Sequence, residues 1–138
     1  MARVINPETA GKQRNRMVKG LVISMRALMS QPDVDDSSLD VAAFMALSLD
    51  GIADTIEATV VPWEKRNYWV KADRFRMEWA WAESLGADMR RGVLEEDWEL
   101  IAATCVRIAD KVKKVQVSDR HRMGEPWVGA YQALVEGG

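Results

Sequence analysis

Residues 94–115 read LEEDWELIAATCVRIADKVKKV, and their apolar side chains recur at alternating steps of four and three residues. The series consists of Leu94, Trp98, Ile101, Cys105, Ile108, Val112 and Val115. Residues separated by such steps lie on the same side of an α-helix, whereas on a β-strand the residues that share a face are two positions apart. The stretch therefore predicts an amphipathic helix that follows the acidic residues 95–97 and runs to about Val117.

Three more long helices are predicted earlier in the chain. They cover about residues 7–29, 38–61 and 68–91. Asn6 and Pro7 are typical of a helix start, and Pro62 is expected to end or kink the second helix. Gly92 is expected just after the end of the third helix. A short last helix, opened by residues 124–126, is expected to dock on the others because it is too short to be stable alone.

The third helix is expected to bury a wide apolar arc. This arc consists of Val70, Phe75, Met77, Trp79, Trp81, Ala82, Leu85 and Met89. No segment of the chain alternates with a period of two between hairpin turns. We therefore predict one all-α domain over residues 1–138, an antiparallel up-and-down four-helix bundle with a short C-terminal capping helix.

Composition excludes several classes of protein. Of the 138 residues, 48% are hydrophobic and 29% are charged, which is typical of a folded chain, and the net charge of −2 provides no overall basic excess for nucleic acid. The apolar run 41–49 is much shorter than the roughly 20 residues that span a bilayer, and residues 1–7 contain no apolar leader. A single cysteine excludes an internal disulfide. We expect a cytoplasmic protein without a membrane partner.

Charge is unevenly distributed along the chain. Residues 1–30 carry six bases and one acid, whereas residues 31–62 carry seven acids and no base. We expect the first two helices to attract each other along their edges, although each exposed ion pair contributes only about 0.2–1 kcal/mol.

The residues that could perform chemistry do not form a known catalytic or metal-binding pattern. His121 is the only histidine, and Cys105 lies on the apolar stripe of its helix. Asp50, Asp54 and Glu57 share one helix face and could hold Mg²⁺, but this face is expected to be solvated, and the Glu-x-x-His pattern of di-metal bundles does not occur. Phosphate-binding glycine motifs are also missing. We predict no catalytic residue, metal or cofactor.

Residues 63–81 combine bases with aromatic residues, which permits two interpretations. Arg66, Lys71, Arg74 and Arg76 could meet the phosphates of single-stranded nucleic acid while exposed rings stack on its bases. Alternatively, the rings belong to the core and the arginine stems cover them.

A second set of charges lies on apolar helix faces. Lys71, Arg74 and Glu78 fall on the line continued by Trp81, and Arg14 lies on the apolar line of the first helix. Paired carboxylates or an anionic ligand would explain a partly buried arginine. These residues therefore form either an internal network that fixes the packing or a binding site for a phosphate-like ligand.

Self-association is the remaining prediction. Phe44 and Leu47 are expected to project from the acidic side of the second helix, where a monomer would leave them exposed. We therefore predict a non-enzymatic interaction or scaffold module that forms a homo-oligomer, with a dimer as the commonest choice, or that binds another protein. The alternative is a module that binds single-stranded nucleic acid or a phosphate ligand through the third helix.

Overall fold

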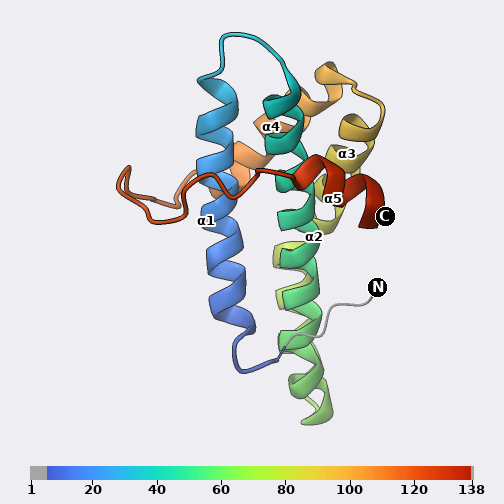
Figure 1. Cartoon of the computed structure of the whole chain (residues 1–138). Helices are drawn as coiled ribbons and strands as arrows, with labels where there is room; N and C mark the ends of the chain where they lie inside the picture. The colour runs from blue at the N-terminus through green and yellow to red at the C-terminus, as the bar shows by residue number, and fades with distance from the viewer. Residues whose placement is uncertain (1–5, 138) are drawn as a thin grey trace.

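The computed structural model describes residues 6–137 and contains five helices (Figure 1). They are α1 (Ala10–Met29), α2 (Asp36–Lys65), α3 (Trp69–Leu94), α4 (Trp98–Val112) and α5 (Ala130–Gly137). No residue in this range lies in a strand. The predicted all-α class, with four long helices and a short C-terminal one, is confirmed. The prediction of one domain over residues 1–138 and that of a missing leader also involve residues 1–5 and 138, which lie outside the described residues.

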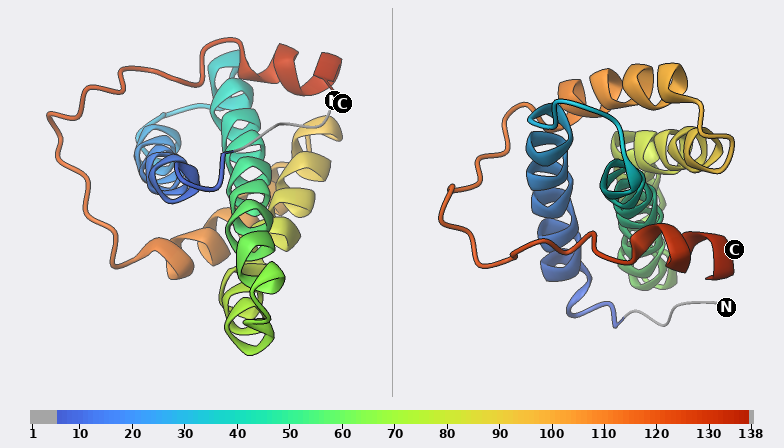
Figure 2. Two further views of the ribbon diagram at one scale, coloured as in Figure 1. Left: turned by 90° about the horizontal axis from the view of Figure 1, so that it is seen from below. Right: turned by 45° about the horizontal axis from the view of Figure 1, so that its top comes forward.

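The central element is α2, which contacts α1, α3 and α5. Its first half is buried on nearly every side because small residues there let the neighbouring helices approach. The buried residues of this half are Val41, Ala42, Ala43, Met45, Ala46, Ser48, Leu49, Gly51 and Ile52. The other helices are therefore arranged around α2 (Figures 1 and 2).

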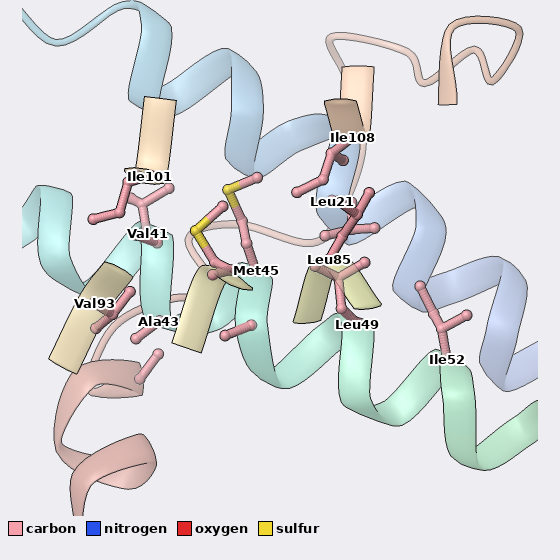
Figure 3. Close-up of a cluster of buried hydrophobic side chains, with 14 of the residues drawn as sticks. Leu21, Val41, Ala43, Met45, Leu49, Ile52, Leu85, Val93, Ile101 and Ile108 are labelled. Carbon is pink, nitrogen blue, oxygen red and sulfur yellow. The ribbon is translucent and has the colours of Figure 1, made fainter. Parts of the chain in front are cut away.

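One hydrophobic core joins the helices. In Figure 3, Met45 and Leu49 of α2 gather with Leu21 of α1, Leu85 of α3 and Ile108 of α4. Each of these side chains is buried, and full burial of one such side chain contributes about 1.5–3 kcal/mol. The predicted stripe of α4 therefore does point inward, through Ile101, Ile108 and Val112.

The first three helices alternate in direction, whereas α4 lies across α1 and α3 (Figures 1 and 2). Residues 113–129 then lead around the outside of α1 to α5, where the Asp40 carboxylate accepts hydrogen bonds from the backbone N–H groups of Gly129 (3.3 Å) and Tyr131 (2.9 Å). The antiparallel up-and-down arrangement of all four long helices stays a prediction. None of the helices in residues 6–137 is both long and apolar enough to span a membrane.

Two predicted helix limits near the ends of α1 and α2 were wrong. Residues 6–9 form a turn, in which the Asn6 side chain accepts from the N–H of Glu8 (2.9 Å), so α1 starts three residues late. Pro62 does not end α2, because it lies within the last turn and removes only one backbone hydrogen bond, and the kink that was the alternative stays a prediction. Asn67, with φ of 65°, instead terminates α2 through bonds from Asn67 N–H to Glu64 and from Tyr68 N–H to Trp63.

The junction between α3 and α4 also differs from the prediction. Gly92 lies inside α3, and the left-handed residue after the helix is Glu96, with φ of 49°. Asp97 then caps α4 by accepting from the N–H of Leu100 (3.1 Å). Gly92 is required for packing instead, since a Cβ there would lie 2.8 Å from Cγ1 of Ile101.

The limits of α4 and α5 and one face of α3 were also predicted incorrectly. α4 ends at Val112, and beyond its end the Val117 carbonyl accepts a hydrogen bond from Arg26 (2.7 Å). α5 starts at Ala130, after a turn over residues 126–129. Val70 and Met77 are 65% and 76% exposed, so the apolar arc of α3 is narrower than its sequence indicates.

The contact between α2 and α3 depends on Gly86. A Cβ at this position would lie 2.9 Å from Oδ1 of Asp50 and 3.2 Å from Cβ of Leu49. The Asp50 carboxylate is held by Arg90 from the next turn of α3, so it has little freedom to move aside. Any side chain at this position would therefore force Leu49 or Asp50 to shift.

We expect Gly86→Ala to lower the free energy of unfolding by about 1–3 kcal/mol, because the added methyl group forces α2 and α3 apart. Gly11→Ala is the matched control on α1, where the new Cβ would meet nothing closer than 3.7 Å. This control is expected to raise the stability by up to about 1 kcal/mol, since alanine favours helix. Urea unfolding followed by circular dichroism measures both values, and a stabilising Gly86→Ala would contradict the close contact.

Candidate functional site

The aromatic residues of α3 and the end of α2 form one row of rings. Trp63 meets Phe75 edge to face, with ring centroids 5.3 Å apart, and Phe75 lies 6.4 Å from Trp79. Trp79 in turn stacks on Trp81 at 5.6 Å. All four rings are partly buried. They therefore offer less open ring surface to nucleic-acid bases than their sequence spacing indicates.

Arg14 of α1 lies over this row. Its guanidinium carbon is 5.0 Å from the Phe75 ring centroid and 5.5 Å from that of Trp79. It also donates to the hydroxyl oxygens of Thr55 (3.4 Å) and Thr59 (3.2 Å) of α2. Burial lowers the pKa of the Arg14 side chain, but a guanidinium stays protonated at physiological pH. Arg14 thus connects α1 to both α2 and α3 through rings and hydroxyls.

The other predicted charges of α3 do not share this environment. Lys71 lies over the Trp63 ring at 4.2 Å, so Lys71 and Arg14 occupy different rings of the same row. Arg74 and Glu78 are exposed to solvent. The row therefore brings together two of the four charges that the sequence placed on apolar faces.

Arg76 is held by carboxylates of α2. It donates to both oxygens of Glu57 (2.9 and 3.2 Å) and to both oxygens of Glu64 (2.8 and 2.9 Å), and Asp73 lies 3.7 Å away. These hydrogen bonds raise the pKa of Arg76 and lower the pKa of Glu64. Because its donors are engaged, Arg76 is not available to a phosphate unless this cluster opens.

Arg66 lies at the turn between α2 and α3, which projects beyond the first turn of α1 (Figure 1). Tyr68 and Trp69 are 53% and 54% exposed there. Residues 65–72 contain Lys65, Arg66 and Lys71 and no acid. This hairpin tip combines exposed rings with bases that form no ion pair within residues 6–137.

Phe44 and Leu47 were predicted to be exposed, and this prediction was wrong. Both are partly buried and pack against the core. A Cβ at Gly20 of α1 would lie 3.3 Å from the Phe44 ring, so the missing side chain at Gly20 allows Phe44 to lie against α1. Their role as an interface stays a prediction, but they line a cavity between α1, α2 and residues 122–126.

A second hollow lies between α1 and α4. This α1–α4 groove encloses about 380 Å³ and is lined by Met25, Leu28, Met29, Ala102, Cys105, Val106 and Ala109. None of these side chains is charged. Val106 of α4 lies outside the predicted apolar stripe and is 71% exposed.

The predicted acidic face of α2 is used for packing. Asp50 pairs with Arg90 and Glu57 with Arg76, and both arginines belong to α3. These two acids were predicted to attract the bases of α1, but they pair with bases of α3 instead. Asp54 also has an interaction partner. Within residues 6–137 no group of three or more His, Cys, Asp or Glu side chains is arranged to hold a metal ion.

The lone histidine and lone cysteine lie in different places. His121 lies in the segment after α4, where its Nδ1 accepts from the N–H of Met123 (3.3 Å). Cys105 is a free thiol in the α1–α4 groove, and burial raises its pKa to about 11. A thiol with such a pKa is almost entirely protonated at neutral pH and is a poor nucleophile.

Searches against protein families, curated proteins and solved structures find no match to this chain. The candidate sites therefore stand on their geometry alone.

Sequence reasoning missed three features of these sites. It treated Arg76 as available, although Glu57 and Glu64 were visible at spacings that an antiparallel α2–α3 hairpin brings together. It did not anticipate the contact of Arg14 with two rings. The two hollows involve α1, α2, α4 and the segment after α4, and no local pattern specifies how such distant segments meet.

We expect Arg76→Leu to destabilise the protein, because it leaves Glu57 and Glu64 close together without their cation. Arg74→Leu is the matched control, two residues away on the same helix and exposed, and should stay within about 0.5 kcal/mol of the unchanged protein. Urea midpoints at neutral pH measure the difference. Equal midpoints for the two variants would show that the Arg76 cluster contributes nothing.

The effect of Arg76→Leu should depend on pH. A carboxyl whose pKa is lowered in the folded protein stabilises the fold above its unfolded pKa, about 4.3 for Glu, and loses this contribution as the pH falls further. The stability difference between the unchanged protein and Arg76→Leu should therefore shrink between neutral pH and about pH 3. A difference that stays constant over this range would argue against ionised Glu64 as the partner.

Proposed function

We propose that the protein is a non-enzymatic interaction module that self-associates through the α1–α4 groove. The observation that carries this proposal is an uncharged apolar hollow of about 380 Å³ with Val106 strongly exposed at its edge. A contiguous apolar surface that is open to solvent is a candidate protein–protein contact. A dimer is the simplest assembly that would cover it.

A second copy of the chain is the occupant that the charges favour. A two-fold contact places the same face of both copies against each other, so a face with net charge repels itself. The groove contains no charge, and the ion pairs Arg107–Asp88 (3.0 Å) and Lys113–Asp110 (3.5 Å) are formed within the chain. The hairpin tip, by contrast, carries three bases without an acid and would repel a second tip.

The available side chains also favour binding over catalysis. The single imidazole, His121, bonds to its own segment, and the single thiol, Cys105, is held in its protonated form. An unpaired cysteine is compatible with a reducing compartment, and we propose a cytoplasmic location for that reason.

Light scattering coupled to size-exclusion chromatography tests the assembly. We expect the unchanged protein to elute with the mass of a dimer at micromolar concentration, and Val106→Ser to weaken the dimer at least tenfold. Val128→Ser is the matched control, since Val128 (72% exposed) is as exposed as Val106 (71%) but lies outside the groove. A monomer at every concentration, or a dimer unaffected by Val106→Ser, would refute the groove as the interface.

Alkylation of Cys105 provides an independent measurement of the same contact. If a second copy covers the groove, the rate of reaction with iodoacetamide at mildly alkaline pH falls as the protein concentration rises. Val106→Ser should remove this concentration dependence while leaving the slow intrinsic reaction, which the raised pKa causes.

The hairpin tip supports a second candidate function, the binding of single-stranded nucleic acid. Tyr68 and Trp69 expose their rings beside Lys65, Arg66 and Lys71, which is the combination that binds bases by stacking and phosphates by charge. Arg76 contributes little to this proposal because Glu57 and Glu64 hold it.

Fluorescence anisotropy with a labelled oligothymidylate tests this second function. Three phosphate contacts predict that the logarithm of the association constant falls with the logarithm of salt concentration with a slope of about −2. Trp69→Ala combined with Arg66→Ser should abolish binding, whereas Lys12→Ser combined with Lys19→Ser on α1 should change it little. Undetectable binding at low salt, or equal binding by both double variants, would exclude the hairpin tip.

A further inference from the structure

We propose that the cavity bordered by Phe44 and Leu47 binds a small amphipathic anion, with an apolar body and a carboxylate or phosphate head. This cavity, here called the loop cavity, is an open hollow of about 400 Å³ between α1, α2 and the segment after α4. It is lined by Arg16, Met17, Phe44, Leu47, Ser48, Arg122, Met123 and Pro126. The inference is independent of self-association, because the loop cavity and the α1–α4 groove share no lining residue.

The walls of the loop cavity are apolar and come from distant parts of the chain. Phe44 and Leu47 of α2 pack against the core on one side, and Met17 of α1 does so on another. A Cβ at Gly20 would lie 3.3 Å from the Phe44 ring and 3.7 Å from Cε of Met123. The missing side chain at Gly20 thus lets α2 and the later segment approach the same part of α1, and their apolar side chains surround the hollow.

The charge of the loop cavity has one sign. Arg16 and Arg122 line it and are exposed, and within residues 6–137 neither has an ion-pair or side-chain hydrogen-bond partner. No acidic residue is among the lining residues. Elsewhere in the molecule, Arg76 and Arg90 are neutralised by carboxylates of α2. Two free guanidinium groups beside an apolar hollow match an anionic head attached to an apolar body, because arginine binds carboxylates and phosphates with two parallel donors.

The size of the cavity limits the ligand. A volume of about 400 Å³ equals roughly 13 water molecules at about 30 Å³ each, so it accommodates a body and head of about ten non-hydrogen atoms. Pockets of this size bind small molecules through apolar walls and a few polar groups that orient the ligand. Ser48, which is 5% exposed and lines the cavity, adds a hydroxyl that can donate to the head.

Octanoate and octyl phosphate are suitable probes. 1-Octanol is the control with the apolar body but no charge, and acetate is the control with the charge but no apolar body. We expect at least one of the two anionic amphiphiles to bind with a dissociation constant of about 1 mM or tighter. The anion that binds more tightly identifies the head. 1-Octanol and acetate should bind at least tenfold more weakly than that anion.

The protein's methionines report where the probe binds. In spectra of protein labelled at the methionine methyl groups, the signals of Met17 and Met123 should shift on titration, whereas that of Met77, exposed on α3, should not. Shifts of Met25 and Met29 instead would place the probe in the α1–α4 groove and overturn the proposal.

Arginine variants complete the test. Arg16→Gln combined with Arg122→Gln should weaken binding of the anion at least tenfold. Because both side chains are exposed and unpaired within residues 6–137, the fold should be unchanged, so the signals of the methionines outside the cavity should not shift. Arg120→Gln is the matched control, since Arg120 is exposed in the same segment but does not line the cavity. Three outcomes would each refute the inference: unchanged binding in the double variant, binding of 1-octanol as tight as that of the anion, or no binding of either anion at about 10 mM.

Discussion

The structure depends on the close contact between α2 and α3. Gly86 admits Leu49 and Asp50 of α2 at distances that no larger residue permits, and the alanines of α2 allow the same approach from other sides. Because α2 contacts three other helices, its position sets those of α1, α3 and α5 together. The α1–α4 groove and the loop cavity lie on the periphery of this arrangement, where α1 meets α4 or the later segment, and the hairpin tip is the turn between α2 and α3.

Arginine has three different roles in the molecule, and its surroundings determine which one. Arg76 and Arg90 are bound to carboxylates of α2 and hold the α2–α3 hairpin together. Arg14 lies over two aromatic rings and bonds to two hydroxyls. Within residues 6–137, Arg16 and Arg122 have neither kind of partner, and both border an apolar cavity. These two arginines, rather than the more numerous ones along α3, therefore define the anion site that we propose.

The helical class followed from local spacing, because three- and four-residue steps directly specify one face of a helix. Helix ends depended on tertiary packing: Gly92 became a packing residue against Ile101, and Glu96 took the left-handed position instead. The sites were less accessible to prediction. Arg76 was predicted as a phosphate contact and Phe44 as an exposed interface residue, but whether an arginine meets acids, or an aromatic ring meets a glycine, depends on which helices lie side by side. A single sequence does not contain that information in a local pattern.

The stacked pair of Trp79 and Trp81 has a consequence for spectroscopy. Two indoles whose centroids are 5.6 Å apart and whose planes differ by 28° have coupled electronic transitions, and such coupling generates circular dichroism of its own. This signal overlaps the region from which helix content is derived. Ellipticity measured on this protein therefore contains an indole contribution, and replacing either tryptophan would alter the spectrum even if every helix stayed intact.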